Sequence, residues 1–397
     1  MPCNRLEHFM TKKDFPIRLF TLYVIFYAGQ AVYNTYLNLY LNDIGFSKAQ
    51  MGAITSISTL LILLTQPLWG LASDRTKNKN RILGLLFLGS AALSLAFYIN
   101  TRYVFVLVVV SLLAMFYNPC MPLQDNLTLE ILEKSGSKVD FGHIRLGGTI
   151  GYAITALVVG YFIHDAYRQI FYIFCAVMVI CFFFIRSMAP VAGHRREQKN
   201  SYKQILKNPA MLCLVFFNLM FSLGSSIFYG YYPLYFQTIG GNSSFIGLLM
   251  FACAFSEIPL WFFAGKIVNK FGYARMMVLA AIITSARWFL LYLVTNPVLI
   301  ILVNLTHGMG FVSFSYCMLV YINKNVPKDM RATGQTVNAL VVTIFTRVIG
   351  GYVIGYASDV LGVENMMLFA GVAILAATVV FIVWYRSIRH HHAVSAQ

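Results

Sequence analysis

The segment Gly70-Leu-Ala-Ser-Asp74-Arg75, with Arg81 six residues further on, joins two long apolar runs. About 195 residues later, the segment Gly265-Lys-Ile-Val-Asn269-Lys270, with Arg275 after it, joins another two such runs. The chain therefore contains the same glycine–polar–basic pattern twice. A twofold internal repeat among apolar runs is typical of membrane transporters.

The composition supports a membrane protein. Of the 397 residues, 59% are hydrophobic and 11% are charged, and the mean hydropathy is +0.69, which excludes an ordinary soluble domain. A transmembrane helix needs about 20 apolar residues. We expect twelve such helices, near residues 16–41, 48–73, 81–99, 103–130, 143–163, 168–187, 210–237, 244–268, 275–294, 297–322, 332–357 and 365–386. The predicted fold is an all-α membrane protein.

The longest polar stretch, residues 188–209, divides these twelve helices into two groups of six. We predict an N-terminal six-helix bundle over residues 1–187, a cytoplasmic linker over 188–209 and a C-terminal six-helix bundle over 210–397. The repeated segment makes the two bundles pseudo-symmetric. In transporters of this architecture, the substrate site is expected near the middle of the membrane, between the two halves.

The net charge of +16 reflects membrane topology. Lysine and arginine gather in alternate connections, within residues 75–81, 195–207, 266–275 and 324–331, while the other connections hold few of them. This asymmetry follows the positive-inside rule, and an even number of helices then places both termini in the cytoplasm. We therefore expect contacts with membrane lipids and no binding of nucleic acid.

Two further segments carry a family resemblance. They are Pro122-Leu-Gln-Asp125 and Phe141-Gly-His-Ile-Arg145-Leu-Gly-Gly-Thr-Ile-Gly151-Tyr152. Together with Gln66-Pro67-Leu-Trp-Gly-Leu-Ala-Ser-Asp74, they resemble the major facilitator superfamily, and within it the lactose permease type of proton symporter and its oligosaccharide and nucleoside relatives. The resemblance covers most of the chain and implies a transporter of the bacterial inner membrane. It also implies a conformational latch at Gly70, Asp74 and Arg75, a charged loop that only fixes topology being the alternative.

The resemblance implies substrate-binding residues in both halves. In this family a fourth-helix carboxylate and a fifth-helix arginine bind the sugar, and an aromatic ring seven residues after the arginine stacks on it. Asp125, Arg145 and Tyr152 occupy these places, although the ring belongs to a tryptophan in the lactose permease. Arg287 and His307 occupy the places of the family's ninth-helix arginine and tenth-helix histidine. A structural ion pair is the alternative role for Asp125 and Arg145.

The proton-carrying group is expected at a different place than in the lactose permease. That protein has a glutamate three residues after the histidine, where this chain has Gly310. The acid within an apolar run of the second half is Glu257, two residues before Pro259. A proline in a helix frees a backbone carbonyl one turn earlier and often produces a kink. We predict that Glu257 or Asp125 couples transport to the proton gradient, with a structural or substrate-binding role as the alternative for Glu257.

Neutral polar side chains recur at helical spacing, so that each series shares one helix face. The two series are Gln30, Asn34 and Asn38 in the first expected helix, and Asn218, Ser222, Ser225 and Tyr229 in the seventh. Such faces suit hydroxyl-rich ligands, and we expect Asn34, Asn38 and Tyr229 to bind the substrate. Hydrogen bonds between helices are the alternative.

Several kinds of chemistry have no motif in the sequence. It contains no phosphate-binding loop, no HExxH segment, no CxxC pair and no Gly-x-Ser-x-Gly segment. We therefore expect no enzyme activity, no metal site and no cofactor, with the proton gradient as the energy source. Arg347 in the eleventh helix has no acid near it in the sequence, and its partner could be an anionic substrate group or Glu257.

These observations favour a secondary transporter that couples a sugar, oligosaccharide or nucleoside to protons by alternating access. A transporter of a small organic or aromatic acid is an alternative, because three arginines but only two acids lie within the expected helices. An efflux antiporter is another, although the fifth helix lacks the Gly-Pro motif of drug antiporters. A non-transporting receptor or a lipid flippase is the alternative from a different class. We expect a small polar solute as the partner, and a monomer.

Overall fold

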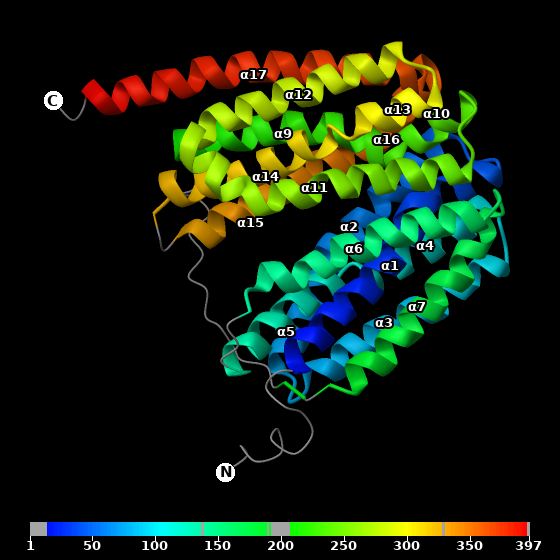
Figure 1. Ribbon diagram of the computed structural model, residues 1–397. Helices are drawn as coiled ribbons and strands as arrows, with labels where there is room; N and C mark the ends of the chain where they lie inside the picture. Colours follow the sequence, from blue (N-terminus) through cyan, green and yellow to red (C-terminus); the bar gives the residue numbers. More distant parts are fainter. Residues whose placement is uncertain (1–13, 136–138, 189, 192–206, 328–329, 395–397) are drawn as a thin grey trace. The chain divides into compact units, whose positions relative to one another are not determined.

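The computed structural model describes residues 14–135, 139–188, 190–191, 207–327 and 330–394. Over these residues the chain forms helices and no strand (Figure 1). The helices belong to two compact units, one of Met1–Phe46 with Ile57–Glu197 and one of Ser47–Ser56 with Gln198–Gln397. The first turns of the second helix are therefore part of the second unit.

The first unit is held together by the packing of α1 against α6 and α7, and of α3 against α4 and α7. Its elements are α1 (Asp14–Asp43), α2 (Lys48–Arg75), α3 (Lys79–Leu95), η1 (Ala96–Tyr98), α4 (Tyr103–Tyr117), α5 (Cys120–Ser135), α6 (Phe141–Phe162), η2 (Tyr167–Gln169) and α7 (Ile170–Arg186). Glycine allows α6 to approach α1 closely, since a Cβ atom at Gly151 would lie 2.3 Å from the carbonyl oxygen of Val24. This close contact brings α6 next to the tyrosines of α1.

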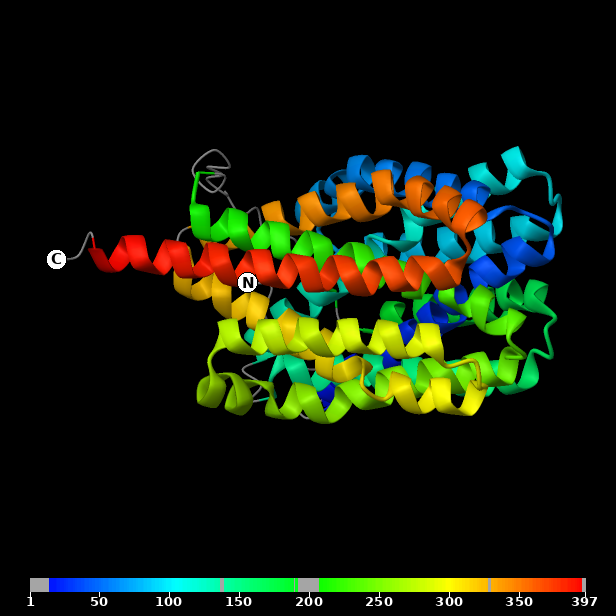
Figure 2. The same cartoon turned by 90° about the horizontal axis from the view of Figure 1, so that it is seen from above.

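The second unit is centred on α12, which packs against α14 and α17. Its elements are α9 (Pro209–Gly230), α10 (Tyr232–Thr238), α11 (Ser243–Phe271), α12 (Tyr273–Leu293), α13 (Pro297–Asn304), α14 (His307–Asn325), α15 (Arg331–Thr343), the π-helical turn η4 (Ile344–Ile349), α16 (Gly350–Leu361) and α17 (Val363–Val394). α17 runs alongside α9 and α12 (Figures 1 and 2), and α11 packs against α14. Trp288, Tyr232 and Tyr321 are fully buried in this unit.

The helices have the length and composition of membrane spans. Eleven helical segments of the described residues are long and apolar enough to cross a membrane. The twelfth span is the 30-residue α1, whose hydropathy is lowered by five tyrosines and by Gln30, Asn34 and Asn38. Each predicted range coincides with one helix or with consecutive helices, so the twelve-helix all-α membrane fold is confirmed. Exposed apolar side chains such as Leu64 and Val383 fit a surface in contact with lipid.

Three of the predicted helices are interrupted in the structure. The breaks lie at Asn118–Pro119, Tyr231 and Leu305–Thr306. Proline explains the first two, because Pro119 lies in one break and Pro233 lies in the first turn of α10, and a proline ring cannot continue the hydrogen bonding of a preceding helix. The third break lies directly before His307. Broken helices in membrane proteins often line binding sites.

The predicted cytoplasmic linker, residues 188–209, lies largely outside the described residues. α7 ends at Arg186 and α9 begins at Pro209. The division between the two units, at Glu197 and Gln198, falls within the same stretch. The side of the membrane on which this stretch lies stays a prediction.

Candidate functional site: two polar clusters within the helices

Four helices of the second unit bring polar side chains together around His307. The Nδ1 atom of His307, on α14, lies 2.6 Å from Nη1 of Arg287 on α12. Its Nε2 atom lies 3.0 Å from the Tyr229 hydroxyl on α9 and 3.5 Å from Oε1 of Glu257 on α11. The structure thus unites four residues that are far apart in the sequence, each of which the sequence had marked as a candidate.

The contacts of His307 determine where its ring proton lies. An arginine guanidinium can only donate hydrogen bonds, so Nδ1 of His307 must accept the bond from Arg287. The ring is therefore neutral, with its proton on Nε2. That Nε2–H group faces the Tyr229 hydroxyl and the Glu257 carboxylate. His307 presents a fixed donor to these two oxygens.

Arg287 is fixed by several neighbours and is only 3% exposed. Its Nη1 atom lies 3.4 Å from Oδ1 of Asn304, and its guanidinium carbon lies 4.8 Å from the centre of the Phe228 ring. Asn304 and Phe228 were not among the candidates from the sequence. The buried arginine therefore acts on His307 directly, while its predicted contact with substrate is untested.

Close packing of α14 against its neighbours sets the place of Glu257. The backbone N–H of Gly308 donates to Oγ of Ser256, at 2.9 Å, so α14 meets α11 one residue before Glu257. Gly310 meets α12 just as closely, because a Cβ atom there would lie 2.1 Å from Oγ1 of Thr284. The position that carries a glutamate in the lactose permease thus has no room for one here.

A second polar cluster joins α1, α5 and α6 in the first unit. The Tyr23 hydroxyl donates to Oδ1 of Asp125 at 2.5 Å. The Arg145 guanidinium lies over the Tyr27 ring, 4.4 Å from its centre, and 6.0 Å from the centre of the Tyr23 ring. No ion pair within 4 Å joins Asp125 to Arg145 in the described part of the chain, so the structural ion pair considered as an alternative is not formed.

Tyr23 and Tyr27 were missed by the sequence reasoning, although a signal for them exists. They lie eleven and seven residues before Asn34, which places them on the helix face that Gln30, Asn34 and Asn38 share. Asn34 is exposed on α1. The aromatic residues of this face contact the two charged groups of the cluster, Asp125 and Arg145.

The remaining predicted substrate residues have protein partners. The Tyr152 hydroxyl lies 3.1 Å from Oγ1 of Thr35, and Asn38 also has a partner in the structure. On α9, Asn218 donates to Asn338 of α15 at 3.1 Å, and Ser222 donates to Asn218 at 3.2 Å. Hydrogen bonding between helices therefore explains this part of the polar series on α9, while Tyr229 belongs to the His307 cluster.

The predicted latch contains an additional buried lysine. Lys79 is 4% exposed, and its Nζ atom lies 2.5 Å from Oε1 of Glu130 on α5 and 3.7 Å from Oδ1 of Asp74 at the end of α2. No described helix approaches Gly70 closely, because a Cβ atom there would meet no atom within 4 Å in the described part of the chain. Arg75 is exposed at the last residue of α2.

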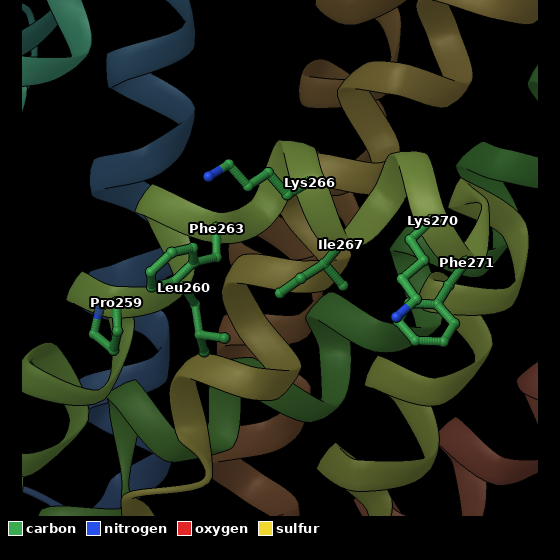
Figure 3. Close-up of a pocket in the computed structure, with 7 residues that line it drawn as sticks. All are labelled: Pro259, Leu260, Phe263, Lys266, Ile267, Lys270 and Phe271. Carbon is green, nitrogen blue, oxygen red and sulfur yellow. The ribbon is translucent and has the colours of Figure 1, made fainter.

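An apolar groove of about 370 Å³ runs along the second part of α11 (Figure 3). It is lined by Pro259, Leu260, Phe263, Lys266, Ile267, Lys270 and Phe271. All seven come from one helix, and none is a predicted substrate residue. Glu257 lies two residues before the groove begins. The polar clusters, and not this groove, are therefore the candidate functional site. Among the described residues, no cluster of His, Cys, Asp or Glu side chains could hold a metal ion.

Comparison with known proteins agrees with this architecture. A maltose permease from Geobacillus stearothermophilus is 27% identical over 357 residues, covering 86% of this chain and 88% of the permease. Nucleoside permease NupG from Escherichia coli (strain K12) is 21% identical over 364 residues, 84% of this chain and 86% of its own. The protein described as "Probable 3-phenylpropionic acid transporter" from the same strain is 20% identical over 314 residues, 76% of this chain and 80% of its own.

The fold is shared with solved transporters. The crystal structure of nucleoside transporter NupG matches with a TM-score of 0.80 and 18% sequence identity, over 94% of this chain and 99% of that chain. Relatives and structural neighbours are transporters and not enzymes. The family model described as "MFS_1 like family" matches residues 17–370, which is most of the chain. This multi-pass membrane protein is therefore a secondary transporter that belongs to the MFS_1 like family of the major facilitator superfamily.

Proposed function

We propose that the protein is a proton-coupled symporter for a sugar, an oligosaccharide or a nucleoside, which it moves by alternating access. The contact of Glu257 with His307, beside Tyr229, carries this proposal. It joins an ionisable group to two groups that bind hydroxyls. The maltose and nucleoside permeases among the relatives support the class of solute.

The cluster provides a physical route for coupling. An ionised Glu257 attracts the Nε2–H group of His307, 3.5 Å away, and competes with any solute hydroxyl for it. When Glu257 is protonated, this charge-assisted attraction is lost and the donor is free for the solute. Proton and solute therefore favour the same state of the site. Because linkage is reciprocal, a bound solute also makes Glu257 easier to protonate.

The first unit supplies the groups that orient the solute. The Arg145 guanidinium lies over the Tyr27 ring, 4.4 Å from its centre, and a guanidinium can donate to two oxygen atoms at once. Asp125 accepts a bond from Tyr23 and adds an acceptor for solute hydroxyls. Arg145, Asp125, Asn34 and Tyr152 are thus proposed as solute-binding residues of the first unit, and Tyr229 and His307 as those of the second. Asp125 is the alternative proton carrier.

The proposal includes the location and orientation of the protein in the cell. We propose that the protein lies in the bacterial inner membrane as a monomer with both termini in the cytoplasm. The clustering of lysine and arginine in alternate connections supports this orientation. With one proton and a neutral solute, each cycle moves one net charge, so that a membrane potential of 100 mV contributes about 2.3 kcal/mol to accumulation.

A second candidate function is the transport of a small organic or aromatic acid. The relative described as a 3-phenylpropionic acid transporter favours this function. So does the excess of arginine over acidic residues within the helices, with Arg145, Arg287 and Arg347 against Asp125 and Glu257. Uptake of labelled maltose and of labelled 3-phenylpropionate, measured separately in the same protein, distinguishes the two functions, because each function predicts uptake of only one of the compounds.

The test uses the full chain in proteoliposomes with labelled maltose and labelled uridine. We expect a proton gradient to drive accumulation of at least one of them, and a protonophore to abolish it. Glu257→Gln, which imitates the protonated acid, should lose accumulation but retain exchange of labelled for unlabelled solute, because exchange needs no deprotonation. The control Glu133→Gln changes an exposed acid of α5 and should leave both processes intact.

Three results would contradict parts of the proposal. Accumulation that resists a protonophore excludes proton symport. Accumulation that survives in Glu257→Gln moves the coupling role to Asp125. The wild-type protein could fail to accumulate either solute and, in a binding assay, bind 3-phenylpropionate but neither maltose nor uridine. That result replaces the sugar or nucleoside class by the acid class.

A further inference from the structure

Arg347 lies in the middle of a membrane-spanning segment. It is fourteen residues from either end of the span Thr333–Leu361. At a rise of about 1.5 Å per residue, roughly 21 Å of helix separates it from each end, which is farther than an arginine side chain reaches by snorkelling. A phosphate group of a lipid headgroup therefore cannot be its partner.

The backbone around Arg347 has an unusual form. Residues Ile344–Ile349 form the π-helical turn η4. Such turns are rare in proteins as a whole, but they occur frequently at functional sites. Groups near this turn are bonded from α2, since Ser56 Oγ accepts from the backbone N–H of Tyr352 at 3.0 Å and lies 3.4 Å from the Arg347 carbonyl oxygen. These contacts hold the end of the π turn against α2.

The Arg347 side chain is exposed and has no partner among the described residues. No hydrogen bond, ion pair or aromatic ring contact is formed by its guanidinium, in contrast to Arg287, which bonds His307 and Asn304. An exposed guanidinium cannot face lipid at this depth without a large cost in free energy. The exposed side chain is therefore better accommodated by water than by lipid.

The charges of the second unit leave Arg347 unbalanced. The described acids of this unit are Glu257, Asp359 and Glu364. Glu257 lies beside His307, and Asp359 accepts the backbone N–H groups of Lys48 and Ala49 at 3.0 and 2.7 Å. Asp359 is also twelve residues from Arg347, about 18 Å along the helix. No described acid of this unit therefore balances the charge of Arg347.

We propose that Arg347 binds an oxyanion of the transported solute, so that the preferred solute is a hydroxyl-rich molecule with a carboxylate or a phosphate group. The planar guanidinium donates two parallel hydrogen bonds to such a group and neutralises its charge. This inference rests on the proposed function and narrows its substrate class. An acidic sugar or nucleotide would explain both the sugar and nucleoside permeases among the relatives and the excess of arginine over acidic residues within the helices, since it carries hydroxyls and a negative charge.

The test compares matched pairs of solutes on the purified full-length protein. Binding of glucose, glucuronate and glucose 6-phosphate, and of uridine and uridine monophosphate, is measured by isothermal titration. We expect at least one acidic member to bind about 10- to 100-fold more tightly than its neutral parent, as charged hydrogen bonds predict. The glucuronate and phosphate arms show which oxyanion is preferred.

Variants then assign the preference to Arg347. Arg347→Gln should reduce the affinity for the acidic member to that for the neutral parent and leave the parent's affinity unchanged. Arg347→Lys should retain part of the preference, because the charge remains and the paired donors are lost. Arg331→Gln, the same substitution at the first residue of α15, is the control and should change neither affinity.

Two outcomes overturn the inference and are distinguishable from failure of the proposed function. If neutral parents bind as tightly as acidic members in the wild-type protein, or if Arg347→Gln weakens both equally, Arg347 does not read an oxyanion. Proton-driven uptake of maltose or uridine in the same protein would then still support the proposed function. If a proton gradient drives uptake of none of the probes, acidic or neutral, the proposed function fails and this inference with it. The wild-type comparison holds even if a variant does not fold.

Discussion

Gly310 offers a test of how tightly α14 packs against α12, and hence of why a glutamate does not fit at this position. A Cβ atom at residue 310 would lie 2.1 Å from Oγ1 of Thr284. That oxygen donates to the carbonyl of Ala280 at 2.9 Å, so Thr284 can yield only by rotating and breaking this bond. Gly310→Ala should therefore destabilise the protein, although alanine is the better helix former.

The expected free energies follow from this geometry. Overpacking of a tight site costs about 1–3 kcal/mol. Alanine in place of glycine within a helix contributes about 0.8–1 kcal/mol in the opposite direction. Once Thr284 is replaced by alanine, the nearest remaining atoms lie 3.4 Å (the residue 284 Cβ) and 3.5 Å (the Ala280 carbonyl oxygen) away, which are ordinary contacts. Gly310→Ala should thus destabilise the wild-type protein and stabilise Thr284→Ala by up to about 1 kcal/mol.

The assay is a double-mutant cycle of unfolding free energies, measured by titration with SDS in mixed micelles. Trp288 is a convenient reporter, since it is fully buried and lies one helical turn after Thr284. The change of sign between the two backgrounds is the diagnostic result. Equal destabilisation by Gly310→Ala in both backgrounds would refute the assigned contact, and with it the explanation for the missing carboxylate.

Three further predictions concern the first unit. Arg145→Lys should weaken solute binding at least about tenfold in a titration, because a lysine cannot hold two oxygens in one plane; affinity equal to wild type removes Arg145 from the site. Tyr23→Phe leaves Asp125 without its donor and should lower the unfolding free energy by about 1–3 kcal/mol, whereas an unchanged value shows that the bond is dispensable. Lys79→Ala should shift the midpoint of thermal unfolding downwards far more than Lys77→Ala, since Lys79 is buried and Lys77 is exposed; equal shifts contradict the buried ion pair.

The helices were predictable because hydropathy is a property of consecutive residues. The twelve predicted ranges agree with the structure wherever about 20 apolar residues follow one another. The breaks were harder to predict, because Pro67 and Pro259 lie within continuous helices while Pro119 and Pro233 accompany interruptions. Whether a proline breaks a helix depends on the neighbours that bond the freed carbonyl groups.

Most residues of the two polar clusters could be predicted from the sequence, but the contacts between them could not. The sequence marked Glu257 and His307 as charged or polar residues in apolar surroundings, and the structure brings them within 3.5 Å. It could not show that Asp125 is bonded to Tyr23, because tyrosine is too frequent in α1 to attract notice. Lys79 was similarly hidden, since it belongs to a run of basic residues that reads as a solvated loop. Contacts of this kind depend on the packing of distant helices.

The bond between Arg287 and His307 has a consequence for energy conservation in the cell. A histidine passes protons along a chain only when one ring nitrogen can accept a proton while the other releases one. Nδ1 of His307 is occupied by a donor that never gives up its own proton, so the ring cannot act as a wire between two water-filled spaces. If Glu257 is the proton carrier, as proposed, His307 offers it no onward path, and a proton bound there leaves by the route it entered or together with the solute. A proton symporter with this arrangement would not leak protons through His307 when no solute is bound.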